Sequence, residues 1–210
     1  MASLTHVDRP VYNGFMPSPT TLELKDRPAG ERILLTAHEL FYREGIRATG
    51  IDRVIAESGV TKVTFYRHFP SKNELIRAFL AYRHERWMKW FVDALERHGA
   101  HRGKGIDALV PALRDWFADA GYRGCAFLNS VSELGTALPE VVGMARSHKR
   151  EMTAEIERLL PPSRQRAKDA QLVALAVDGA IVHAQFDETP DAALKTLDRL
   201  VKLLRSSSEA

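Results

Sequence analysis

The segment from Ile51 to Phe69 constrains the fold of this 210-residue chain more than any other stretch. Its sequence, IDRVIAESGVTKVTFYRHF, predicts two short helices that meet at Gly59, because glycine accepts the left-handed conformation that a tight interhelical turn needs. The shared core is expected to comprise Val54, Ile55, Val60, Phe65 and Phe69. Polar side chains of the second helix are then free to face outward. This pattern is a helix-turn-helix, whose second helix enters the DNA major groove.

Helical periodicity continues on both sides of this segment. Upstream, apolar residues from Ile33 to Phe41 share one face of a helix that ends near Gly45. Downstream, Ser71 and Glu74 form a capping-box pattern that begins a long helix reaching towards residue 98. Further helices are expected over about 106–117, 139–160, 164–186 and 191–205. Because no alternating strand pattern of convincing length appears, the predicted class is all-α.

Charge, cysteine content and the first residues indicate the setting. Between Arg27 and Lys89 there are 12 Lys and Arg against 7 Asp and Glu, whereas the chain after Trp90 has 16 against 17. The positive excess therefore lies around the helix-turn-helix, where it favours phosphate contacts, although solvated basic helices are also common. A single Cys125 suits a reducing compartment. Without a signal-like start or a long apolar run, we expect a cytoplasmic protein with no membrane partner.

The sequence resembles the TetR family of bacterial one-component regulators. The resemblance rests on ATGIDRVIAESGVTKVTFYRHFPSKNELIRAFL at 48–80 and on RILLTAHELFYREGIRATG at 32–50. A further stretch, RGCAFLNSVSEL at 123–134, is similar to part of many C-terminal domains of the family. Gly50 departs from the Ser or Thr that caps the second helix in many members. Residues 1–26 contain Pro10, Pro17 and Pro19 without sustained periodicity, which predicts a flexible arm. The resemblance implies a three-helix DNA-binding domain at 27–72 and a larger helical ligand-binding and dimerisation domain at 73–210.

Several residues match DNA-contacting positions of that family. Lys62 and Thr64 match positions that approach base edges, and Tyr66 and His68 match backbone contacts. Thr49 and Lys72 match phosphate contacts, the latter at a helix N-terminus that favours an anion. Arg53 and Arg67 complete the expected set, but both are equally compatible with solvated surface positions. The implied partner is a double-stranded, pseudo-palindromic operator.

The C-terminal part contains candidates for a ligand pocket and a dimer interface. Aromatic and polar residues suited to a pocket are Trp87, Trp90, Phe91, Trp116, Tyr122, Cys125, Phe127, Asn129 and His183. For any single aromatic residue, an ordinary core position is the alternative. The expected homodimer interface comprises Leu172, Leu175, Ala176, Gly179, Leu194, Leu197, Val201 and Leu204, in two helices that form a four-helix bundle in the family. Packing within one chain is the other explanation of that pattern.

These features predict a DNA-binding regulator, in most such proteins a repressor that an unknown small-molecule effector releases from its operator. The alternative is a ligand-independent DNA-binding or partner-binding factor with an architectural or cell-division role. No phosphate loop, hydrolase or metalloprotease motif is present, so no enzyme activity is expected. Glu96, His98 and His101 lack a further ligand at a recognisable spacing, so neither a metal nor a cofactor is expected. Cys125 is interpreted as a small core residue, with a redox switch as the alternative.

Overall fold

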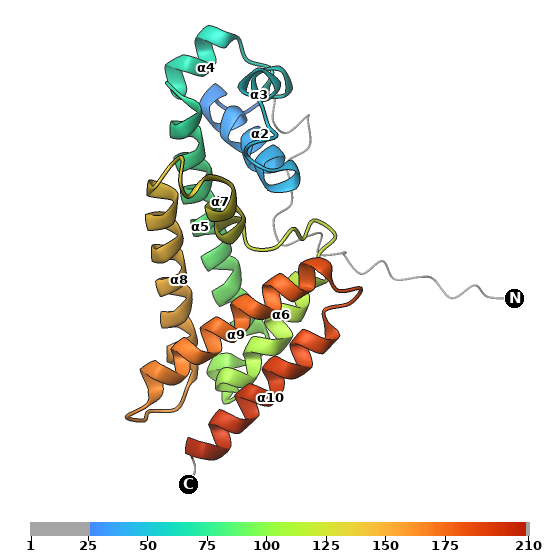
Figure 1. The fold of residues 1–210 in the computed structure, drawn as a ribbon, viewed down its shortest axis with the longest axis vertical. Helices are drawn as coiled ribbons and strands as arrows, with labels where there is room; N and C mark the ends of the chain where they lie inside the picture. The colour runs from blue at the N-terminus through green and yellow to red at the C-terminus, as the bar shows by residue number, and fades with distance from the viewer. Residues whose placement is uncertain (1–25, 209–210) are drawn as a thin grey trace, which may run out of the picture.

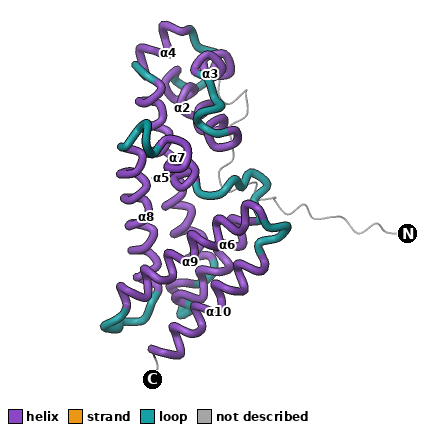
Figure 2. Tube along the Cα trace, viewed as in Figure 1, coloured by secondary structure: helices purple, strands orange, loops and turns teal. Residues whose placement is uncertain are grey.

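The computed structural model describes residues 26–208, and all regular structure in that range is helical (Figures 1 and 2). The α-helices are α2 (Ala29–Glu44), α3 (Ile51–Ser58), α4 (Lys62–His68), α5 (Lys72–Arg97), α6 (Leu109–Phe117), α7 (Ala126–Leu134), α8 (Glu140–Leu159), α9 (Arg166–Phe186) and α10 (Asp191–Ser208). The predicted all-α class is confirmed. The predicted flexible arm lies, apart from Asp26, outside the described residues. In the described range, no helix is long and apolar enough to span a bilayer.

Helices α2, α3 and α4 pack together against the first turns of α5 at one end of the molecule (Figure 1). We call residues 29–80 the head and residues 81–208 the body. The head is held by a fully buried core that includes Ile33, Leu40, Phe65 and Leu75. Helix α5 continues from the head into the body, so one rigid element connects the two.

The local signals of the helix-turn-helix act largely as the sequence predicts. Gly59 adopts the left-handed conformation with φ of 64°, which lets α3 end directly before α4. The Thr61 hydroxyl caps α4 by accepting the Thr64 N–H at 3.2 Å, and the Ser71 hydroxyl accepts the Glu74 N–H at 3.1 Å. The Glu74 carboxylate pairs with Arg77 at 2.6 Å instead of completing the capping box. Helix α3 begins at Gly50 with no side-chain cap, as its sequence implies.

The body is built around an aromatic cluster. Trp87 stacks on Phe91 with 4.7 Å between ring centroids and meets Trp116 edge-on at 5.4 Å. Helix α10 packs against α9 and α6 and closes the body on the side away from α8 (Figure 1). Helix α7, which the sequence analysis did not predict, lies beside α8 and α5 below the head. It presents the residues 126–134 of the third family-like stretch towards the joint between head and body.

Candidate nucleic-acid interface

Helix α4 presents an exposed surface because its seven residues commit only one side chain, Phe65, to the core. Lys62 keeps 67% of its side chain exposed, and Tyr66 has an exposed fraction of 41%. Arg67 and His68 are exposed as well. The helix therefore offers cationic and hydrogen-bonding groups on a short, protruding element at the tip of the head (Figure 1).

Val63 is a candidate interface residue that the sequence analysis missed. Its side chain is 79% exposed, which is unusual for a β-branched apolar residue and has no packing explanation. It lies on the same helix between Lys62 and Thr64. An exposed apolar group at this position suits contact with the C5 methyl of thymine, the one apolar feature of the major-groove edge. Apolarity outside the predicted core was the available signal.

Lys62 and Thr64 differ in how free their side chains are. The Lys62 ammonium lies 3.7 Å from the Asp52 carboxylate in a highly exposed pair, which DNA phosphates or bases can replace at little cost. Thr64 is half-buried, and its hydroxyl shares a 2.9 Å hydrogen bond with that of Thr61. A base contact by Thr64 stays a prediction and requires this bond to be shared or broken.

Two predicted phosphate contacts have other roles in the structure. The prediction for Thr49 is wrong for its side chain, which is fully buried and donates its hydroxyl to the Gly45 carbonyl at 2.8 Å. The Lys72 ammonium donates to the carbonyls of Ile46 and Thr49 at 2.6 and 2.7 Å. Burial of Lys72 lowers its pKa, opposed by the nearby Glu133 carboxylate. Lys72 thus holds the turn between α2 and α3 in place. Its ammonium group is engaged by these carbonyls and would have to leave them to contact a phosphate.

Arg53 is exposed but strongly engaged. Its guanidinium pairs with Glu44 and, at 2.7 Å, with Glu57. These hydrogen bonds raise its pKa, with Glu44 contributing most. A phosphate contact by Arg53 would have to replace two carboxylates, so among the predicted contacts we rank it behind Lys62, Tyr66, Arg67 and His68.

The head has the features of a DNA-binding domain: an exposed second helix, a glycine turn and an excess of positive charge around them. Comparison with known proteins identifies the family of this domain. The family model described as bacterial regulatory proteins of the tetR family matches residues 33–79, which is the head almost in full. The head is therefore a DNA-binding domain of the TetR type. The chain is a TetR-like DNA-binding transcriptional regulator rather than an enzyme.

The similarity extends beyond the head. The transcriptional regulator UidR of Escherichia coli (strain K12) is 25% identical over 150 residues, covering 71% of this chain and 70% of UidR. The transcriptional activator FasR of Mycolicibacterium smegmatis is 32% identical over 101 residues, covering 47% of this chain and 45% of FasR. The crystal structure of a TetR-family regulator from Streptomyces coelicolor aligns with a TM-score of 0.70 at 27% identity, covering 85% of this chain and 95% of that one.

In this chain, the turn at residues 121–125 joins head and body through its backbone. The Tyr42 hydroxyl at the end of α2 donates to the Gly124 carbonyl at 2.9 Å and accepts the Arg123 N–H at 3.0 Å. The amides of Asn129 and Gln185 both donate to the Arg123 carbonyl, at 2.8 and 3.0 Å. Three helices, α2, α7 and α9, thereby fix one turn. Gly124 is required there, because its φ is 79° and an added Cβ would overlap the Gln185 amide.

A buried guanidinium lies next to this turn. Arg83 of α5 has an exposed fraction of 2%, lies 3.7 Å from the centre of the Tyr42 ring, and is 3.3 Å from His38 Nε2. Burial, then the charges of Arg83 and Arg86, lower the pKa of His38 to about 3. His38 is therefore neutral near pH 7. Because arginine can only donate, His38 Nε2 is the acceptor.

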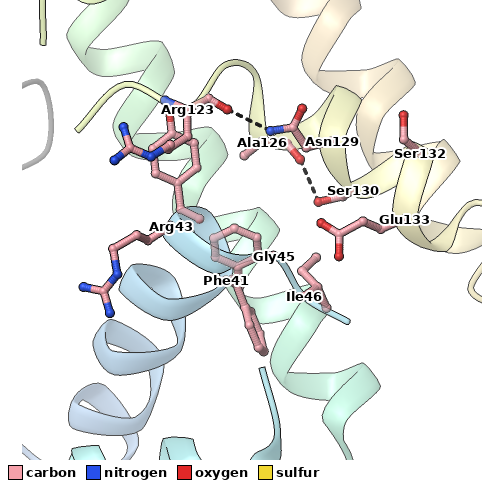
Figure 3. Close-up of a pocket in the computed structure, with 12 residues that line it drawn as sticks. Phe41, Arg43, Gly45, Ile46, Arg123, Ala126, Asn129, Ser130, Ser132 and Glu133 are labelled. Carbon is pink, nitrogen blue, oxygen red and sulfur yellow. Dashed lines mark hydrogen bonds between the residues drawn. The ribbon is translucent and has the colours of Figure 1, made fainter. Parts of the chain in front are cut away.

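The predicted ligand residues divide into three groups. Trp87, Phe91, Trp116, Cys125 and Phe127 are buried, while Trp90 and Tyr122 are half-buried and pack against the same core. Asn129 lines a cavity at the joint between head and body (Figure 3). The assignment of His183 to a pocket lining is wrong, since more than half of its side chain is exposed on α9, where it pairs with Asp187. Among the described residues, no His, Cys, Asp and Glu cluster suits a metal ion.

The predicted homodimer interface also needs correction. Leu194, Leu197 and Val201 of α10 have exposed fractions of 2% or less within the single chain, so they belong to its own core. Leu204 and Ala176 are half-buried against that core. By contrast, the outer face of α9 has no cover in the single chain. Its exposed residues are Leu172, Leu175, Gly179, Val182 and Phe186.

Proposed function

We propose that this TetR-family regulator is a homodimeric repressor that binds a pseudo-palindromic operator and is released by a small molecule. One observation carries the proposal: a polar and basic recognition helix at one end of the molecule coexists with an uncovered apolar helix face at the other (Figure 1). The first suits DNA and the second suits another copy of the chain. The FasR name describes an activator, so the sign of control needs its own test.

In the proposed complex, α4 lies in the major groove. Lys62 and Thr64 approach base edges near its N-terminus, and Val63 contacts a thymine methyl. Tyr66, Arg67 and His68 follow along the helix and contact the DNA backbone, where they fix register without reading sequence. The positive excess between Arg27 and Lys89 supplies a salt-dependent attraction to phosphates.

The proposed dimer interface is the outer face of α9. Leu172, Leu175, Val182 and Phe186 follow one another at intervals of three, seven and four residues along one side of the helix, with 46%, 72%, 42% and 66% of their surfaces exposed. Gly179 lies among them, and the space around it is open, so a second backbone can approach closely. Isologous packing of this face about a twofold axis places two recognition helices for two half-sites.

A ligand site in the chain is supported by buried polar groups that an apolar core does not require. The Trp87 indole N–H is buried and has no hydrogen-bond partner among the described residues. His148 packs flat on Phe127, with 3.9 Å between ring centroids. Burial, then the charges of Lys149, His84 and Arg83, lower the pKa of His148 to about 2. A ligand with a hydrogen-bond acceptor would satisfy such a donor.

Selection of binding sequences from a random DNA library tests the operator part of the proposal. We expect an enriched inverted repeat, bound by an even number of chains in native mass spectrometry. A reporter carrying that sequence across its promoter should be silenced. A thermal-shift screen of metabolites should then find compounds that raise the melting temperature and relieve silencing. Binding without sequence preference, with no stabilising compound, would instead indicate the architectural alternative.

A further inference from the structure

A cavity of about 390 Å³ lies at the joint between head and body (Figure 3). Its lining comes from the end of α2 and the turn that follows, from α5, and from α7. The volume is in the range of small-molecule sites. Because the walls belong to both parts of the molecule, any occupant contacts the head and the body together.

Glu133 of α7 supplies the only carboxylate in the lining. One of its oxygens accepts the backbone N–H of Arg47 at 2.8 Å, and the same carboxylate lies against Gly45. Within residues 26–208, no Lys, Arg or His nitrogen lies within ion-pair distance of Glu133. The Lys72 ammonium is held instead by two carbonyls of the same turn. A half-buried carboxylate therefore faces the cavity with no described cation within ion-pair distance, and Lys72 acts on it only through its nearby charge.

The remaining walls are apolar or already satisfied. Phe41, Ile46 and Phe79 are buried side chains that form an apolar floor. Arg43 pairs with Glu39 and Glu44, and the Arg123 guanidinium donates to the carbonyls of Ala120 and Tyr122. In Figure 3, both guanidinium groups lie on the opposite side of the cavity from Glu133 and are directed away from it. The Glu133 end is thus electronegative and bordered by aromatic rings.

We propose that this cavity binds a small organic ammonium ion with an apolar body. The ammonium group pairs with Glu133, and the apolar part covers Phe41, Ile46 and Phe79. The partly desolvated setting strengthens the ion pair. The regulatory meaning of this site rests on the proposed release of operator DNA by a ligand.

The site has a direct route to the recognition helix. Residues 45–50 connect α2 to α3, and two side chains hold this turn: Glu133 through the Arg47 N–H, and Lys72 through the carbonyls of Ile46 and Thr49. An ammonium ion at Glu133 competes with the Arg47 N–H for the carboxylate. Loss of the hydrogen bond between Glu133 and the Arg47 N–H leaves Lys72 to hold the turn. The turn can then shift, and α3 and α4 shift with it. A ligand bound preferentially to the shifted head lowers operator affinity.

Titration of the full chain with 2-phenylethylamine, followed by backbone NMR and calorimetry, tests the site. The amide signals of Arg47 and Glu133 should shift, and the neutral isostere 2-phenylethanol and the anion 3-phenylpropionate should bind about tenfold more weakly or worse. Glu133→Gln keeps an oxygen that can accept the Arg47 N–H but removes the charge. This variant should fold normally and lose the preference for the amine, whereas Glu85→Gln, at an exposed carboxylate on α5, should keep it.

The outcomes separate this site from the broader proposal. If the amine shifts no joint signals, or if Glu133→Gln binds it as well as the wild type does, the cavity is not an ammonium site. If 3-phenylpropionate binds best, the arginine side of the cavity decides the ligand and the inference is overturned. If saturating amine leaves operator affinity unchanged, the cavity is not an effector site. None of these results affects release by a ligand bound elsewhere, which the metabolite screen tests independently.

Discussion

Helices α4 and α10 both have a pattern from which the sequence predicts an outward-facing function, but the structure treats them differently. Helix α4 buries Phe65 and leaves Lys62, Val63 and Tyr66 exposed. Helix α10 buries Leu194, Leu197 and Val201 against α9 and α6. The difference has a simple physical cause. Polar groups left over from core packing stay available for a partner, whereas an apolar seam gains most by burial in its own chain, where no association entropy opposes it.

The largest loss of stability is expected when the buried apolar face of α10 is disrupted. Changing Leu197 and Val201 to Glu places two charges in the core of the single chain, at a cost of several kcal/mol each. We expect loss of the cooperative thermal transition in circular dichroism, with exposed apolar surface that binds a hydrophobic dye. A folded, monomeric double variant would show that the seam serves association after all.

The outer face of α9 should respond in the opposite way. Leu175→Glu with Phe186→Glu changes two side chains that are already 72% and 66% exposed in the single chain, so the fold should persist. Sedimentation should show monomers, and operator affinity should fall by at least about tenfold, since one head holds only half a site. Ala167→Glu is a matched control, because it is exposed on the same helix but on another face. A dimeric double variant would exclude this face.

Low pH should reduce the stability of the head and of the body together. His38 in the head and His148 in the body have pKa values lowered to about 3 and about 2, from an unfolded value of 6.5. Below pH 6.5 the unfolded chain binds protons that the native chain refuses, so the free energy of unfolding falls as pH falls towards 3. Each histidine contributes about 1.4 kcal/mol per pH unit in that window. Denaturant titrations at several pH values should show a roughly halved slope for His148→Gln. An unchanged slope would mean that His148 is protonated in the folded chain.

Lys72 distinguishes a structural contact from a DNA contact within the head. Lys72→Ala removes charge-assisted hydrogen bonds to Ile46 and Thr49 and should cost about 1–3 kcal/mol of stability. Chemical denaturation measures this loss, and hydrogen exchange should locate it in residues 45–50. The salt dependence of operator binding should change little. If Lys72→Ala instead reduced the salt slope of operator binding by about one unit and kept the stability of the wild type, Lys72 would be a phosphate contact after all.

Lys62 should show the smallest energetic effect and the clearest salt effect. Among the described residues, Lys62 pairs only with Asp52, and that pair is exposed, so Lys62→Ala should leave the melting temperature nearly unchanged. If Lys62 exchanges its pairing with Asp52 for a DNA phosphate, the slope of log affinity against log salt should be about one unit smaller for Lys62→Ala than for the wild type. Operator titrations at four salt concentrations measure it. A steeper or equal slope would place Lys62 outside the DNA contact surface.

The sequence alone determined the helices of the head and the regulator class. Periodicity, Gly59, Thr61 and Ser71 act within a few residues of themselves, so the boundaries of α3, α4 and α5 follow from local chemistry. The exposed set on α4 was predictable for the same reason, although Val63 was missed because only polar and aromatic side chains were considered as DNA contacts. The TetR resemblance rests on this local region too, and the family match covers it.

Only the tertiary structure decided what the remaining side chains do. Thr49 became a buried donor inside the turn that follows α2, and Lys72 became a brace because the same turn comes close to the start of α5. No local pattern encodes the approach of the turn to Lys72. Which of two apolar faces, on α9 or α10, is left uncovered depends on how the helices of the body share their contacts. Glu133 lies 86 residues from Arg47 in sequence, and the cavity beside it exists only because α7 packs under the head. Long-range packing, and not local propensity, sets these positions.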